Sequence, residues 1–92
     1  MHTNSYLIVI ESGKRNYSAF SPDVPGCVTT GGTFDETLKN MREALQLHLS
    51  DEESIPDPRG LAWHLADDSD LSDESLIFAY IPVSEVSPFV ST

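Results

Sequence analysis

The chain has 92 residues, a length that supports one domain with one modest hydrophobic core. Its net charge is −10, from fifteen acidic residues against five basic ones, so direct binding to the phosphate backbone of DNA or RNA is not expected. This charge favours either a basic partner or simple solubility. The single cysteine, Cys27, excludes an internal disulfide. No apolar run is long enough to cross a membrane and the start does not resemble a signal peptide, which together predict a cytoplasmic protein.

Three short strands are predicted before the middle of the chain. Residues 6–11 (YLIVIE) form an apolar, β-branched run that ends in a turn, and residues 16–21 (NYSAFS) follow closely enough to make an antiparallel hairpin with it. In the second strand Tyr17 and Ala19 share one face. The prolines and the Pro25-Gly26 pair of SPDVPGC predict a turn, after which a third strand begins at Cys27.

The next segment is predicted to be an amphipathic helix. Thr33 fits the N-cap and Glu36 the third helical position, which together make a capping box, and the negative charge of the first turn complements the helix dipole. One apolar stripe at helical spacing follows, made of Phe34, Leu38, Met41, Leu45 and Leu49.

The second half of the chain is less regular. Residues 51–60 end the helix with polar residues and two prolines, and residues 61–68 (LAWHLADD) fit a short helix or a strand equally well. Residues 67–75 carry five acids and are predicted to be a solvated loop. Residues 76–83 (LIFAYIPV) form the last strand, which Pro82 places at a sheet edge.

These elements predict an α+β fold, a single β-β-β-α-β domain. A right-handed crossover through the helix would bring the last strand back parallel to the first, giving a mixed sheet of order 3-2-1-4. One helix covers only one face of such a sheet. The other apolar face and the unpaired edge of the last strand therefore predict self-association into a dimer or larger oligomer.

No catalytic, metal or cofactor site is predicted. The acids Asp35 and Glu36 are accounted for by the first turn of the helix, and Cys27 at the start of a strand is better explained as a small core residue than as a nucleophile. His2, His48 and His64 share no spacing typical of metal ligands.

The stretch from YSAF through PDVPGC to TTGGTFDETLKNMREAL resembles the HicB-like antitoxin family. The family has a similar tyrosine, a P-D-x-P-G-C corner, a G-x-T step and a helix of the form E-x-x-x-N-x-x-E-A-L. The matching residues are Tyr17, Pro22, Asp23, Pro25, Gly26, Cys27, Gly31 or Gly32, Thr33, Glu36, Asn40, Glu43, Ala44 and Leu45. The apolar strand at residues 76–83 also fits the last strand of the family.

The resemblance implies a partial ribonuclease-H-like fold and a non-catalytic role. It implies that the chain neutralises a small basic mRNA-cleaving toxin of the HicA type by occlusion, which the acidic balance suits. Residues 1–92 are expected to form one HicB-like domain without a C-terminal DNA-binding segment, since only nine residues follow Val83.

Two other functions stay open. The first is a metal-dependent nuclease that uses Glu11, Asp23 and Asp35, and the second is a stand-alone oligomeric module that binds a different regulator or a small ligand. For the antitoxin function, charge alone indicates two acidic loops as the partner-binding surface. Both loops are also explained as ordinary solvent-exposed loops. Their residues are Asp51, Glu52, Glu53, Asp67, Asp68, Asp70, Asp73 and Glu74.

Overall fold

A computed structural model describes residues 4–88 of the chain. Four strands form one sheet in the order β3-β2-β1-β4, which confirms the predicted strand order. The strands are β1 (Ser5–Ser12), β2 (Tyr17–Phe20), β3 (Val28–Gly31) and β4 (Ile77–Pro82). The helices are α1 (Phe34–Leu49), α2 (Leu61–Asp67) and α3 (Val83–Val86), with a 3₁₀ helix η1 (Ser69–Ser72) between α2 and β4. None of the helices in this part of the chain is long and apolar enough to span a membrane.

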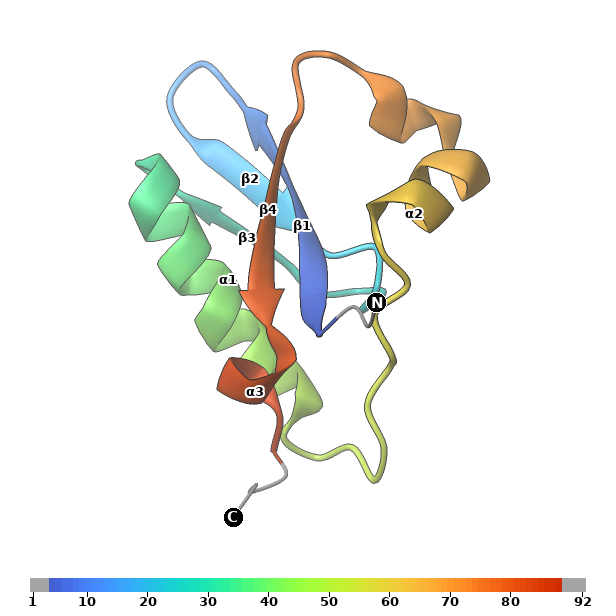
Figure 1. Ribbon diagram of the computed structural model, residues 1–92. Coiled ribbons are helices and arrows are strands. Elements are labelled where there is room, and N and C mark those ends of the chain that lie inside the picture. The colour runs from blue at the N-terminus through green and yellow to red at the C-terminus, as the bar shows by residue number, and fades with distance from the viewer. Residues whose placement is uncertain (1–3, 89–92) are drawn as a thin grey trace.

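The direction of β4 differs from the prediction. All three strand pairs are antiparallel, including β1 with β4, where Ser5 lies opposite Pro82 and Ile10 opposite Ile77. The sheet is therefore not mixed. The reason is the path of the chain after α1, because residues 50–76 run back along the second face of the sheet and β4 then starts from the opposite end (Figure 1).

The main core lies between α1 and the first face of the sheet. Alternate residues of β1 point to opposite faces, and Tyr6, Ile8 and Ile10 pack in this core with residues of the predicted helix stripe. The buried members of that stripe are Met41, Leu45 and Leu49, each at most 1% exposed. Ala19 is buried and Tyr17 packs against the same core, which confirms the predicted face of β2.

The second face is covered in part, contrary to the prediction that it would be bare. Leu7 and Val9 of β1 are buried there under Leu71 of η1, with Leu61 of α2 packed against the same cluster. Figure 1 shows α1 and α2 on opposite sides of the sheet. Residues 61–67 are thus a helix, and the predicted acidic loop contains a 3₁₀ turn with one buried leucine. Self-association stays a prediction that depends on the outer edge of β4 and on the part of the second face that α2 and η1 leave uncovered.

The N-terminus of α1 is capped as the sequence predicts. The Glu36 amide donates to Thr33 Oγ1 at 3.0 Å. The carboxylate of Glu36 accepts from the backbone of Gly32, one residue before the cap, at 2.8 Å. Asn40 of the same helix donates from Nδ2 to the carbonyl of Thr30 at 2.9 Å, which ties α1 to β3.

Replacing Thr33 with alanine is expected to lower the free energy of unfolding by about 1 kcal/mol, because the Glu36 amide loses its acceptor. Urea denaturation followed by circular dichroism measures the change. A Thr33→Ser variant, which keeps the hydroxyl, serves as the control and should retain most of the stability. Equal losses in the two variants would show that the hydroxyl is not what stabilises this end of the helix.

Helix α3, which the sequence does not predict, packs on α1. Arg42 Nε donates to a Glu85 carboxylate oxygen at 2.7 Å, and Gln46 Nε2 donates to the Glu85 carbonyl at 2.9 Å. Val86 is 2% exposed and joins the main core. His2, Phe89 and Val90 lie outside the described residues.

Candidate functional site

The Pro22–Cys27 corner begins where β2 turns away from β1, and two polar side chains take over the hydrogen bonds that β2 no longer makes. Ser21 Oγ donates to the Leu7 carbonyl at 2.8 Å, and Asp23 Oδ2 accepts from the Leu7 amide at 2.9 Å. Buried backbone groups need such partners, and the prolines of this corner cannot donate. Gly26 has φ +87°, a conformation that L side chains rarely adopt, which explains glycine there.

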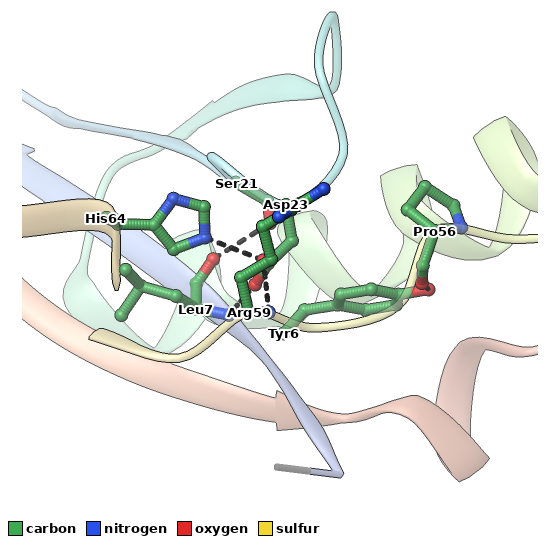
Figure 2. Close-up of polar contacts among 7 residues, drawn as sticks. All are labelled: Tyr6, Leu7, Ser21, Asp23, Pro56, Arg59 and His64. Atoms are coloured by element: carbon green, nitrogen blue, oxygen red, sulfur yellow. Dashed lines mark hydrogen bonds and ion pairs between the residues drawn. The ribbon is translucent and has the colours of Figure 1, made fainter. Parts of the chain in front are cut away.

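Asp23 also holds the second half of the chain onto the sheet. Its Oδ1 accepts from the Arg59 amide at 2.9 Å and lies 2.6 Å from His64 Nε2 (Figure 2). Asp23 and His64 are 6% and 4% exposed, so this hydrogen-bonded pair is shielded from water. One carboxylate thus joins β1, the segment before α2, and α2 itself. We call Asp23, His64 and the amides of Leu7 and Arg59 the Asp23 clamp.

Tyr6 makes a second link to the same segment. Its hydroxyl donates to the Pro56 carbonyl at 2.7 Å (Figure 2). Burial, followed by the charges of Asp23 and Asp57, raises the pKa of Tyr6 to about 12. The tyrosine is therefore neutral, and remains a hydrogen-bond donor, at physiological pH.

A groove of about 780 Å³ lies beside the Asp23 clamp, between the proline corner and α2. Two half-exposed aromatic side chains line it, Phe20 at 38% and Trp63 at 43% exposure. The guanidinium carbon of Arg59 stands 4.4 Å from the centre of the Trp63 ring, a cation–π contact that orients the ring. Asp67 and Asp68 add negative charge to the rim. The arrangement, with exposed aromatic side chains beside charged ones, suits binding of another molecule.

The structure places the predicted partner-binding acids in two separate groups. Asp51, Glu52 and Glu53 follow the end of α1, whereas the other five lie between the end of α2 and the start of β4. All eight are exposed. Two of them also shape the backbone: Asp68 accepts from the Asp70 amide at 3.0 Å, and Asp73 from the Ser75 amide at 2.8 Å. The hydrogen bonds from Ser75 lower the pKa of Asp73.

The three acids of the nuclease alternative are not brought together. Asp23 is taken up by the clamp, Glu11 is exposed on the second face of the sheet, and Asp35 is exposed in the first turn of α1 on the other side. Within residues 4–88, no group of three His, Cys, Asp or Glu side chains could hold a metal ion. Cys27 is 3% exposed, and burial raises the pKa of its thiol, which suits a core residue.

Comparison with known families identifies the chain. Residues 6–90 match the model of the HicB_like antitoxin of bacterial toxin-antitoxin system. The chain belongs to the HicB-like antitoxin family. The match extends well past the motif of the first half, so the groove, α2 and β4 all lie inside the HicB-like region.

Solved HicB structures share this fold. A chain of the HicA3 and HicB3 toxin-antitoxin complex is 30% identical, with a TM-score of 0.64, over 83% of this chain and 93% of that one. The crystal structure of antitoxin HicB3 is 26% identical, with a TM-score of 0.71, over 96% of this chain and 70% of that one.

Two curated relatives are similar in sequence. A UPF0150 protein of Helicobacter pylori is 44% identical over 46 residues, which cover 50% of this chain and 64% of that protein. An uncharacterized 14.9 kDa protein of Haemophilus phage HP1 is 33% identical over 87 residues, which cover 95% of this chain and 56% of that protein. The chain therefore spans less than two thirds of the length of either relative.

The HicB-like motif residues have structural roles in this chain. Tyr17 packs edge-on against Phe34, with ring centres 6.4 Å apart, and joins β2 to α1. Pro22, Asp23, Pro25, Gly26 and Cys27 form the corner, and Gly32, Thr33 and Glu36 form the helix cap. The motif thus builds the scaffold beside the groove. His64, the main partner of Asp23, lies 41 residues away in sequence, and no local pattern predicts that pairing.

Proposed function

We propose that this HicB-like chain is a non-catalytic antitoxin that binds a small basic mRNA-cleaving toxin of the HicA type and neutralises it by occlusion. The similarity to a chain of the HicA3 and HicB3 complex carries the proposal, because it links this fold to a toxin partner. The net charge of −10 agrees with it, since an acidic surface speeds association with a basic protein and competes with RNA for that protein. The proposed activity needs no cofactor.

The test uses the product of the gene next to that of this chain, which the proposal expects to be a small basic protein. Expression of that protein alone should stop growth, and co-expression of the antitoxin should restore it. The purified pair should elute as one complex, and the basic protein should cleave a model RNA only when the antitoxin is absent. A neighbour that neither binds this chain nor is inhibited by it would contradict the proposal.

A further inference from the structure

We infer that the toxin contacts the second face of the sheet, on a surface made of Phe20, Val28, Trp63, Asp67, Asp68 and Asp70, which we call the Phe20 surface. The inference rests on the proposed function and adds the contact site to it. The expected occupant is a positively charged protein surface, such as one that binds RNA, with apolar side chains at its centre.

Phe20 is the centre of this surface because it borders three neighbouring hollows. It lines the 780 Å³ groove together with Pro22 and Trp63. It also lines a hollow of about 520 Å³ against η1, and another of about 400 Å³ over β2 and β3 that includes Val28. Phe20 and Val28 lie opposite each other in the β2–β3 pair. The three hollows therefore adjoin one another at the Phe20 side chain, and we call them together the depression.

The exposed apolar groups of this depression have no cover within residues 4–88. Val28 is 69% exposed, and Phe20 and Trp63 keep 38% and 43% of their surface in water. Leu71 covers β1 but does not extend to β3, so the outer half of the second face stays open. Aromatic anchors inside a polar border are the usual arrangement of residues that dominate binding energy.

Charge decides which occupant fits. Residues 57–76, which border the depression, hold six acids and one basic residue, Arg59, which lies over the Trp63 ring. Helix α1 on the opposite side holds three acids and two basic residues, and its Arg42 pairs with Glu85. The negative field is thus much less compensated beside Phe20 than over α1. A basic partner would be steered to this side, whereas a second acidic copy of this chain would be repelled there.

The depression is also held in shape before any partner arrives. The Asp23 clamp fixes α2 against β1, and Arg59 orients Trp63 from above. A surface that is already ordered loses less conformational entropy on binding than a mobile loop. Of the acids after α1, Glu52 lines a smaller hollow of about 290 Å³ with Leu49 and Ile55, but no Phe, Trp or Tyr side chain lines that hollow.

The test measures binding of the full chain to its neighbouring basic protein by biolayer interferometry at two salt concentrations. A Phe20→Ala variant should raise the Kd by about 10- to 100-fold, mainly through faster dissociation. An Asp67→Asn/Asp70→Asn variant should slow association by about threefold to tenfold and reduce its dependence on salt. Circular dichroism establishes that each variant is folded.

Matched control variants make the same kinds of substitution outside the Phe20 surface. Leu47→Ala removes an apolar side chain that is 77% exposed on α1, and Asp51→Asn/Glu52→Gln removes the same amount of charge after α1. Both controls should bind like the wild type. Control variants that weaken binding as much as the Phe20 and acidic variants would overturn the inference while leaving the proposed function intact. Failure of the wild-type chain to bind would overturn both.

Light scattering tests one remaining alternative, in which a second copy of this chain occupies the depression. If the wild-type chain forms a dimer that the Phe20→Ala variant loses, the depression is filled by a second copy and the inference is wrong. A Phe20→Ala variant with the same mass as the wild type and weaker toxin binding is the expected result.

Discussion

Replacing Asp23 with alanine is expected to lower the free energy of unfolding by about 3 to 5 kcal/mol, a large part of the stability of a domain this size. The Asp23 side chain is fully buried, and its carboxylate is the acceptor for the amides of Leu7 and Arg59 and for the ring of His64. Its removal leaves the buried Leu7 amide and His64 ring and the part-buried Arg59 amide without a partner, which costs more than the loss of one exposed hydrogen bond. Urea unfolding followed by circular dichroism measures the loss.

Three further variants show whether the effect comes from the Asp23 clamp. Asp57→Asn removes the charge of an exposed aspartate beside the same groove, and its stability should stay close to that of the wild type. His64→Ala alone and combined with Asp23→Ala completes a double-mutant cycle, in which the two losses should fall clearly short of adding up. Full additivity, or a loss below about 1 kcal/mol for Asp23→Ala, would show that the contact stabilises little.

Replacing Gly31 with alanine is expected to destabilise the fold by about 3 kcal/mol. A Cβ atom at this position would stand 2.5 Å from Thr37 Oγ1, 2.7 Å from the Thr37 amide nitrogen and 2.8 Å from its Cα. Two of these atoms belong to the backbone of α1, and Thr37 is fully buried, so the helix itself would have to move away from β3. Thermal unfolding of the purified variant measures the effect.

The adjacent glycine provides the control. A Cβ atom on Gly32 would meet only Glu36 Oε1, at the ordinary distance of 3.5 Å, and neither glycine has a positive φ. Gly32→Ala should therefore unfold at nearly the wild-type temperature. Similar melting temperatures for the two alanine variants would mean that the close approach of α1 to β3 does not require a glycine.

Local chemistry in the sequence predicts most of the elements but not the direction of the last strand. The cap at Thr33 and the stripe from Phe34 to Leu49 are read from neighbouring residues, and both were confirmed. The direction of β4 depends on where residues 50–76 run, and the apolar contacts of this segment with the second face come from Leu61, Leu71 and Leu76. Three separated leucines give no periodic signal. The crossover rule was therefore applied to a connection that it does not describe.

As with the fold, the sequence predicted the local part of the candidate site but not its contacts between distant segments. The corner at Pro22–Cys27 was correctly interpreted as a backbone-shaping turn, because prolines and glycine act locally. The role of Asp23 requires partners from three distant segments, and the depression around Phe20 requires β3 and η1 to lie on either side of it. Such contacts come from the tertiary fold and leave no spacing in the sequence.

The antiparallel pairing of β1 with β4 has a consequence for how the protein is made. Ser5 pairs with Pro82, so β1 gains this neighbour only after β4, far along the sequence, has also left the ribosome. Pairings between such distant residues form slowly, and until then one side of an apolar strand can pair with other chains. In the nascent chain, β1 therefore waits longer for its second neighbour than β2, the other inner strand of the finished sheet.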